Sequence, residues 1–289
     1  MFSSVPYVIL PKPRRALTAA IAALLGLSLA ACSAGLPGAD PSAPPNASAA
    51  PQTEHVAATP SAPATPSAPP PQGKGWALSD IPVFPPRPPA QPITLPATGS
   101  VPYLSRIPTQ QPVAFITIDD GNLKLPEAAK LMAAAQVPVT LFLTTDAIKD
   151  DEPYFARLQQ QGAVIEAHTI THTELRGKSY AFQRREICGS ADRLGRLYQR
   201  RPVLFRPPFG TKDATTLRAA HDCGIKAAFM WKETVHKGKV RYQEGKKVLP
   251  GDIILMHFRP AFVKDFLAAL RAIHKAGLTP ALLEDYIPA

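Results

Sequence analysis

The chain of 289 residues contains little cysteine, few acidic side chains and few long apolar runs. Its three cysteines are Cys32, Cys188 and Cys223, and the first of them lies far from the other two. One disulfide, between Cys188 and Cys223, is therefore the most that the C-terminal part of the chain can form. Both of these cysteines lie on predicted helices, and two buried free thiols are an equally ordinary alternative.

The one long uncharged apolar run, Ala16 to Ala31, is too short for a comfortable membrane span. It follows the cations Lys12, Arg14 and Arg15, an order typical of an export signal. It ends in Leu-Ala-Ala-Cys at Cys32, which resembles a bacterial lipobox. The resemblance implies cleavage before Cys32 and lipidation of its thiol, so that the mature chain is exported, tethered to the membrane and faces the cell wall. The alternative is a simple secretory signal with an incidental cysteine.

The segment from residue 33 to about 100 is made largely of proline, alanine, serine and threonine. It holds 18 of the 34 prolines, between Pro37 and Pro96. Such a composition buries too little apolar area to offset the entropy of ordering the chain, and it predicts a disordered linker. The apolar residues from Trp76 to Pro86 are expected to pack in part onto the domain that follows.

Acidic residues number 22 against 32 lysines and arginines, for a net charge of +10. Three cations belong to the signal segment and the linker carries a net −1, which leaves +8 on residues 101–289. A basic exported domain suggests anionic surroundings, either lipid head groups or wall polymers. Nucleic acid is a poor alternative, because export removes the usual partners and no aromatic-interleaved basic stripe is present.

Residues 101–289 form one predicted domain, long enough for a proper core, and we expect it to be monomeric. Short apolar segments alternate along it with segments of helical periodicity, which predicts a parallel sheet covered by helices. About seven such units in this length favour a small α/β barrel over an open sheet. The expected strands are 113–118, 139–143, 164–167, 203–205, 227–229, 253–256 and 281–283, and the expected helices are 126–135, 152–161, 180–198, 213–223 and 262–276.

Two adjacent carboxylates, Asp119 and Asp120, follow the first of these strands and precede Gly121. The carboxyl ends of parallel strands face the active sites of α/β proteins, so acids there are chemical candidates. An ordinary turn is the alternative. Successive residues of a strand point to opposite sides, and we therefore expect the two carboxylates to have different roles.

Two histidines, His168 and His172, follow the third strand in the run His-Thr-Ile-Thr-His. Imidazoles four residues apart can converge on one metal, although such a pair is often incidental. Two histidines and one carboxylate, with water in the fourth position, are a ligand set of hydrolytic Zn²⁺.

Two further strand ends carry polar residues. Arg206 opens the run Arg-Pro-Pro-Phe-Gly, in which the prolines and Gly210 can hold the Phe209 amide in a fixed direction. A rigid loop without catalytic function explains this run equally well. His257 closes the apolar strand after Leu255, where a single histidine is often structural.

Together these residues resemble the polysaccharide deacetylases of carbohydrate esterase family 4, which share the NodB-homology domain. The resemblance covers about residues 112–287 and includes four motifs in family order and spacing: Asp-Asp-Gly, His-Thr-x-x-His, Arg-x-Pro-x-Gly and Leu-x-His. It implies a distorted, incomplete TIM-like (β/α) barrel. It also implies a hydrolase that removes N-acetyl groups from an amino-sugar polymer.

The resemblance assigns a role to each motif residue. It implies Asp120, His168 and His172 as ligands of Zn²⁺, for which Co²⁺ could substitute. Asp119 becomes the general base with Arg206 as its partner, and His257 becomes the general acid. The Phe209 amide contributes to the oxyanion site, while Leu255 and Trp231 belong to the substrate pocket.

Two departures from the family pattern concern substrate preference. The family has an Asp-Trp pair near the fifth strand, whereas Trp231 here is followed by Lys-Glu-Thr. We hypothesise that Glu233 replaces the missing Asp as the partner of Arg206. The family also has Gly-Asn before the first metal histidine, where this chain has Glu166 and Ala167.

Two other functions use the same sequence features. The scaffold could hydrolyse a non-sugar amide, since a fold does not determine function. It could also be a non-catalytic glycan-binding wall protein, although such a binder would not need the complete set of acids and histidines. The sequence does not distinguish among N-acetylglucosamine, N-acetylmuramic acid, chitin oligomers and capsular polymers.

Overall fold

The computed structural model describes residues 75–288, so the expected signal segment, Cys32 and most of the linker lie outside the described part. The strands are β1 (Tyr103–Leu104), β2 (Val113–Asp120), β3 (Thr140–Leu143), β4 (Val164–Ala167), β5 (Leu204–Phe205), β6 (Ala227–Phe229), β7 (Glu233–His236), β8 (Lys239–Tyr242), β9 (Ile253–His257) and β10 (Thr279–Ala281). The helices are α1 (Pro126–Ala135), α2 (Thr145–Ile148), α3 (Glu152–Gln160), α4 (Tyr180–Tyr198), α5 (Ala214–Asp222) and α6 (Phe262–Lys275). Three short 3₁₀ turns are η1 (Leu78–Asp80), η2 (Pro208–Gly210) and η3 (Glu284–Tyr286).

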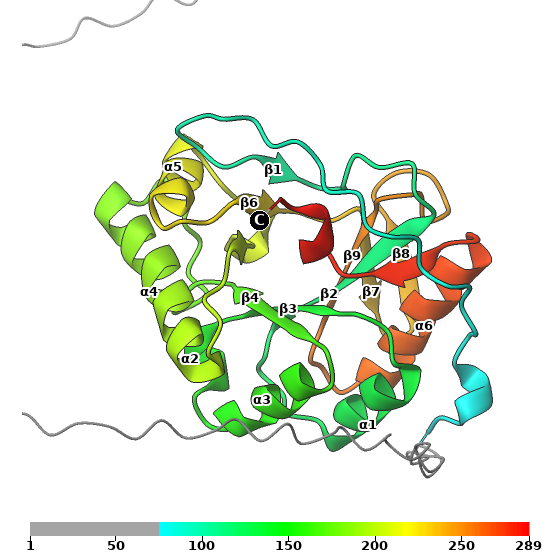
Figure 1. Cartoon of the computed structure of the whole chain (residues 1–289). Helices are drawn as coiled ribbons and strands as arrows, with labels where there is room; N and C mark the ends of the chain where they lie inside the picture. The colour runs from blue at the N-terminus through cyan, green and yellow to red at the C-terminus, as the bar shows by residue number, and fades with distance from the viewer. Residues whose placement is uncertain (1–74, 289) are drawn as a thin grey trace, which may run out of the picture. The chain divides into compact units, whose positions relative to one another are not determined.

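The strands form one curled sheet in the order β1-β6-β5-β4-β3-β2-β9-β7-β8, with β10 paired to the first half of β2. All pairings between strands are parallel except that of the β7–β8 hairpin. The helices lie around the outside of the curled sheet, and the C-terminal turn η3 lies over the middle of the ring of strands (Figure 1). The predicted incomplete (β/α) barrel is confirmed.

Alternation of side chains along the strands divides the core into two layers. In β2, Ala114, Ile116 and Ile118 pack outward against the helices, while Val113 and Phe115 point into the barrel. The inner layer is closed at one end by the C-terminal segment, whose apolar side chains are buried there. The remaining inward positions of β2, Thr117 and Asp119 at its carboxyl end, are polar and buried. The inner face at that end is therefore where the candidate site lies.

Local signals in the sequence determine where the helices begin. Pro126 occupies the first turn of α1, where its missing N–H is not needed. The Ser179 side chain caps α4 by accepting a hydrogen bond from Phe182 N. Asp213 and Thr216 cap α5 reciprocally. As a result, the predicted bounds of α1 and α4 agree with the structure, and those of α5 differ by one residue at each end.

Three features differ from the sequence-based expectation. The last strand is Thr279–Ala281, two residues before its predicted place, because its pairing to β2 fixes its register. The β7–β8 hairpin was not predicted. Packing was expected only for part of the stretch from Trp76 to Pro86, where Trp76 is 6% exposed within the core, yet it continues further along the assigned linker, where Ile93 N donates to Tyr286 O. The packed part of the chain thus begins before residue 101.

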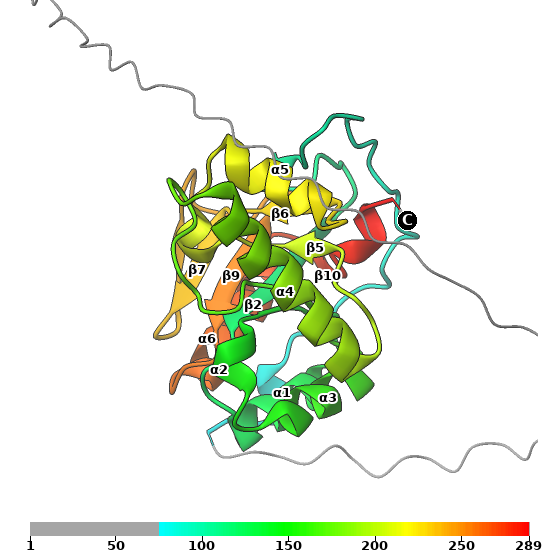
Figure 2. The same ribbon diagram turned by 90° about the vertical axis from the view of Figure 1, so that its left-hand side faces the viewer.

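Cys188 and Cys223 form a disulfide with a Cα–Cα distance of 5.0 Å, which decides between the two alternatives left open by the sequence. The bond joins α4 to the end of α5, and the two helices lie side by side (Figure 2). Among residues 75–288, none of the helices has both the length and the apolar character needed to cross a membrane.

Candidate active site

Asp119 and Asp120 lie at the end of β2, and both of their carboxylates face His168. Asp119 Oδ2 lies 3.7 Å and Asp120 Oδ1 lies 3.5 Å from His168 Nε2. The expectation that the two side chains point in opposite directions is wrong, because Asp120 has a φ of +73°, which interrupts the alternation of the strand. Gly121 follows with a φ of +90°, and a Cβ there would lie 2.6 Å from a methyl group of Ile148. The turn after β2 thus requires glycine and turns the second carboxylate back toward the first.

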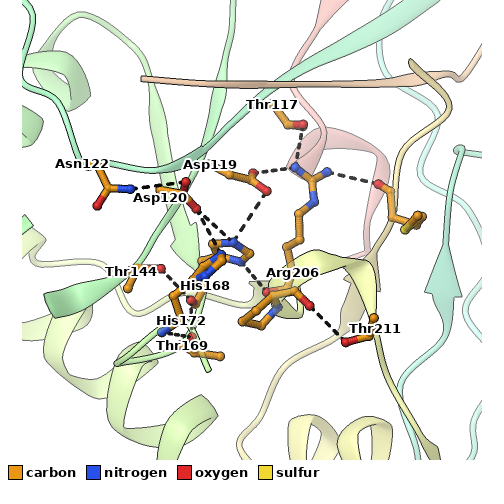
Figure 3. A network of polar contacts seen from close by, with 12 residues as sticks. Thr117, Asp119, Asp120, Asn122, Thr144, His168, Thr169, His172, Arg206 and Thr211 are labelled. Carbon is orange, nitrogen blue, oxygen red and sulfur yellow. Dashed lines mark hydrogen bonds and ion pairs between the residues drawn. The ribbon is translucent and has the colours of Figure 1, made fainter. Parts of the chain in front are cut away.

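A tight loop after β4 brings the two histidines together. Thr169 and His172 both have a positive φ, of +70° and +59°. The Thr169 hydroxyl accepts a hydrogen bond from His172 N at 3.1 Å, which holds the loop closed. The two imidazole rings are 4.9 Å apart, and His172 Nε2 lies 3.3 Å from Asp120 Oδ1 (Figure 3). Strained backbone at functional sites is common, and here it gathers the predicted ligands.

Asp120, His168 and His172 could hold a metal ion, since their ligand atoms lie within 4.8 Å of one another. Two observations support the fit. Asp120 Oδ1 is buried without a hydrogen-bond partner. His168 Nδ1 lies 2.7 Å from the carbonyl oxygen of Arg206, which can only accept, so the proton belongs on Nδ1 and the lone pair of Nε2 faces the carboxylates. Acceptors that converge in this way suit a cation.

The charges of this group act strongly on one another. Burial alone would raise the pKa of Asp120, but the imidazoles of His168 and His172 beside it outweigh burial and hold the pKa far below its usual range. Burial opposes the charged form of His168, while the neighbouring carboxylates favour it and raise its pKa. The pair of carboxylates therefore gives this end of the barrel a strong preference for positive charge.

Arg206 is fully buried and joins several strands at the inner face of the barrel. One of its terminal nitrogens donates to Asp119 Oδ1 at 2.7 Å and to Thr117 Oγ1 at 2.8 Å. The other donates to the carbonyl oxygen of Met230 at 3.1 Å. The guanidinium carbon also lies 4.4 Å from the ring centroid of Phe142. Arg206 therefore holds Asp119 in place, as predicted.

The hypothesis that Glu233 is the partner of Arg206 is wrong. The buried carboxyl of Glu233 faces Asp252, which in turn accepts two hydrogen bonds from Arg106 at 2.6 and 2.8 Å. Burial and the charge of Asp252 raise the pKa of Glu233 to about 9. Besides Asp119, Arg206 donates hydrogen bonds to the Thr117 hydroxyl and the Met230 carbonyl, and not to a second carboxylate.

The Phe209 loop forms one rim of the site. Phe209 has a φ of +60° and is 62% exposed, and its ring lies 4.8 Å from that of His172. Gly210 carries a positive φ as well, and its carbonyl accepts a hydrogen bond from the Tyr103 hydroxyl. The loop is therefore anchored from β1 while the aromatic ring remains on the surface beside a candidate metal ligand.

The remaining predicted residues line the same cleft, which is open and has a volume of about 570 Å³. His257 lies opposite Asp119 in the register of β9 and β2, and Leu255 lies opposite Thr117. Burial lowers the pKa of His257 against the opposing influence of the two carboxylates. Trp231 also lines the cleft. Every site residue predicted from the sequence is thus gathered here, except Cys32, which lies outside the described residues.

Two supporting residues had no predicted role. Thr117 is the one polar residue of an otherwise apolar strand segment, and its inward position two residues before Asp119 was the available signal. Glu186 is 2% exposed on α4 and accepts hydrogen bonds from Ile170 N and Thr171 N. A buried acid on a helix signals a bound partner, but the sequence alone does not indicate that this partner is the histidine loop.

Comparison with known proteins agrees with this geometry. The family model for polysaccharide deacetylase matches residues 106–228. An uncharacterised protein of Streptomyces coelicolor is 39% identical over 192 residues, which cover 64% of this chain and 77% of that protein. The peptidoglycan-N-acetylmuramic acid deacetylase PdaA of Bacillus subtilis is 24% identical over 161 residues, 52% of this chain and 61% of that protein.

The fold is shared with a carbohydrate esterase family 4 pseudoenzyme of Bacillus anthracis. The two structures superpose with a TM-score of 0.57 at 17% identity, over 65% of this chain and 70% of the other. The barrel, the motif residues gathered at one end of it and the matches in sequence lead to one conclusion: this chain belongs to the polysaccharide deacetylases of carbohydrate esterase family 4.

Proposed function

We propose that the domain is a metal-dependent hydrolase that removes N-acetyl groups from an amino-sugar polymer and releases acetate. The observation that carries the proposal is the convergence of Asp120, His168 and His172 in one open cleft, with Asp119 and His257 side by side next to them. The similarity to a peptidoglycan-N-acetylmuramic acid deacetylase supports the same class of substrate.

Asp120, His168 and His172 are the proposed metal ligands, and two imidazoles with one carboxylate suit Zn²⁺ best, with Co²⁺ as a substitute. When bound, such a metal polarises the amide carbonyl and lowers the pKa of a water molecule. The hydrogen bond from His168 Nδ1 to the Arg206 carbonyl holds the first imidazole with Nε2 toward that position.

Asp119 is the proposed general base, which removes a proton from the attacking water. Its Oδ1 is held by Arg206, so Oδ2 remains directed into the cleft toward His168. The Phe209 N–H is the proposed donor to the oxyanion that forms on the amide carbonyl. Its direction is set by the positive φ of Phe209 and by the anchoring of Gly210.

His257 is the proposed general acid, which protonates the departing amine. Its place across from Asp119 puts the proposed acid and base next to each other on neighbouring strands. Its lowered pKa makes the protonated imidazole a stronger proton donor. Leu255 and Trp231 are the proposed apolar wall of the acetyl pocket.

Acetate release tests the proposal directly. Residues 75–289, loaded with Zn²⁺, are incubated with chitin oligomers and with glycan strands of peptidoglycan, and acetate is measured enzymatically. We expect acetate from at least one polymer, and loss of the activity after removal of the metal with a chelator. Stoichiometric metal without acetate from any polymer would instead favour a non-catalytic glycan-binding protein.

We propose further that the chain is exported and held by a lipid on Cys32 at the outer face of the cell membrane. The support is the order of cations, apolar run and Leu-Ala-Ala-Cys at the N-terminus. The full chain should partition into detergent, and Cys32→Ser should move it to the soluble exported fraction. An unchanged distribution would contradict the anchor and leave the enzymatic proposal intact.

A further inference from the structure

The β7–β8 hairpin extends the wall of the active site beyond β9. Across the sheet, Arg241 of β8 pairs with Thr234 of β7, Thr234 pairs with Leu255 of β9, and Leu255 pairs with Thr117 of β2. Paired residues of neighbouring strands present their side chains on the same face. Arg241 therefore lies in one row with residues that support the catalytic centre. Figure 2 shows β7 beside β9 at the edge of the molecule.

The opposite face of the hairpin is occupied by the core. Val235 and Val240 pair with each other and pack with the apolar residues under α6. This packing fixes which face of the hairpin is turned to the site and which to the helix. His236 and Arg241 line the cleft together with Arg259, which follows His257 by two residues. The wall across from the candidate metal ligands is thus basic.

The two arginines of this wall have no acidic partner. One terminal nitrogen of Arg259 lies 3.5 Å from His236 Nδ1, and within residues 75–288 neither Arg241 nor Arg259 forms an ion pair with a carboxylate. The acids that line the cleft are Asp119, held by Arg206, and Asp120, held between the two histidines. Both guanidinium groups are exposed and keep their donors available to a molecule in the cleft.

The distance between β8 and the catalytic residues of β2 suits contact with a substituent of the substrate. Neighbouring strands lie about 4.8 Å apart, so the backbone of β8 is roughly 14 Å from that of β2, with β9 and β7 between them. The Arg241 side chain covers part of this span, because it lines the same cleft as Asp119 and His257. Arginine is also the side chain whose planar fork matches a carboxylate with two parallel hydrogen bonds.

We propose that Arg241 and Arg259 form an anion subsite that selects polymers with a carboxylate on, or next to, the sugar that loses its acetyl group. The inference rests on the proposed deacetylase function and narrows its substrate class. Two sources of the carboxylate fit the same chemistry: the lactyl ether of N-acetylmuramic acid, and a neighbouring uronic acid. A neutral chitin chain offers no partner to either arginine.

The test compares kcat/KM for acetate release from three polymers of similar length. These are chitin oligomers, peptide-free glycan strands of peptidoglycan, and a polymer in which N-acetylglucosamine alternates with glucuronic acid. The variants are Arg241→Gln, Arg259→Gln and the double variant. The matched control is Arg185→Gln, which removes the same charge from the exposed surface of α4.

We expect the wild type to prefer one anionic polymer over chitin, and the polymer preferred identifies the source of the carboxylate. Each arginine variant should lose about tenfold on that polymer, mainly through KM, and clearly less on chitin, because a hydrogen bond to a charged group is lost. The control should retain the wild-type preference. Because exposed charges are screened by salt, the preference should also shrink as ionic strength rises.

Equal losses on all three polymers, or no loss on any, would overturn the subsite and leave the deacetylase proposal standing. Absence of acetate from every polymer with metal-loaded wild type would overturn the proposed function itself. In that case calorimetric binding of the three polymers still decides the subsite. Weaker binding of an anionic polymer to the double variant than to Arg185→Gln supports it, and equal binding contradicts it.

Discussion

The Nδ1 atom of His168 lies 2.7 Å from the carbonyl oxygen of Arg206. This contact joins the ends of β4 and β5, and it links two motifs that are 38 residues apart. The backbone of Arg206 orients the first imidazole, while its side chain holds Asp119. Arg206 therefore orients both a candidate metal ligand and the proposed base. A substitution that keeps its charge but changes its geometry should for this reason still impair the site.

Arg206→Lys should lower turnover at least tenfold while the metal stays bound. Lysine keeps the charge but has no planar fork, so it cannot serve Asp119, Thr117 and the Met230 carbonyl together. The loss of buried hydrogen bonds should also lower the free energy of unfolding by about 2 kcal/mol. Steady-state kinetics, metal analysis and urea denaturation measure the three effects. Full turnover in this variant would show that Asp119 does not depend on Arg206.

Asp119→Asn and Asp120→Asn should fail in different ways, although the two residues are neighbours. Asp119→Asn should keep the metal and lose turnover on the order of 10²-fold, the usual value of a positioned base. Asp120→Asn should bind metal weakly, because it removes the one carboxylate ligand. Only the second variant should recover with excess Zn²⁺ after treatment with a chelator. If Asp119→Asn also lost its metal, the proposed division of roles would be wrong.

Glu186→Ala should weaken metal binding about 10- to 100-fold, which is the usual effect of replacing a residue that holds the metal ligands in place. The Glu186 carboxylate accepts hydrogen bonds from Ile170 N, Thr171 N and the Thr171 hydroxyl, and so it orders the loop between the two histidines. Glu186→Gln keeps an oxygen acceptor and should lose less. Asp192→Asn, on the exposed surface of the same helix, is the control. Zn²⁺ titration against a competing chelator measures all three, and equal affinities would exclude a role for Glu186.

The elements that could be predicted from the sequence are those whose pattern is local. Helical periodicity with a clear first residue predicted α1 and α4, and buried β-branched runs predicted the inner strands. The site could be predicted because parallel strands end at the same edge of a barrel, where their polar residues meet. The four motifs needed no side-chain geometry to be recognised as one site.

What escaped prediction depends on contacts between distant residues. The β7–β8 hairpin is short, polar and basic, with Val235 and Val240 as its apolar pair against α6. Both φ angles of its Lys237-Gly238 turn are positive, but lysine is not among the residues typical of the first position of such a two-residue turn. The positive φ of Asp120 left no signal in the sequence beyond the glycine that follows it. The hydrogen-bond partners of Arg206 depend on which strands lie next to it in the barrel, and the sequence does not show this.

Loss of the disulfide should lower the free energy of unfolding by about 3–4 kcal/mol, the value expected for a closed loop of 35 residues. The bridge between Cys188 and Cys223 lies away from the cleft, so kcat should not change while the domain remains folded. Urea denaturation of the wild type with and without reductant measures the effect free of any substitution. The Cys188→Ser/Cys223→Ser variant should match the reduced wild type, and identical midpoints in all three would contradict the prediction.

Glu233→Gln should remove part of the loss of stability that the wild type shows as pH rises. Glu233 is buried beside Asp252, whose charge is already paired with Arg106, and its pKa is raised from 4.5 to about 9. Between these values the folded state holds a proton that the unfolded state has released. The contribution of Glu233 to the free energy of unfolding is therefore fully present below about pH 4.5. It is lost as the pH rises toward 9, by at most about 1.4 kcal/mol per pH unit.

Glutamine stays neutral at every pH and cannot contribute to this slope. We therefore expect Glu233→Gln and wild type to have similar melting temperatures near pH 5, and the variant to melt higher near pH 9. Glu244→Gln, at an exposed acid that pairs with Lys232 at the surface, should keep the wild-type slope. Melting curves from pH 5 to pH 9 provide the comparison. Parallel profiles for Glu233→Gln and wild type would show that Glu233 is ionised in the folded domain, and that the surroundings of Asp252 accommodate two charges.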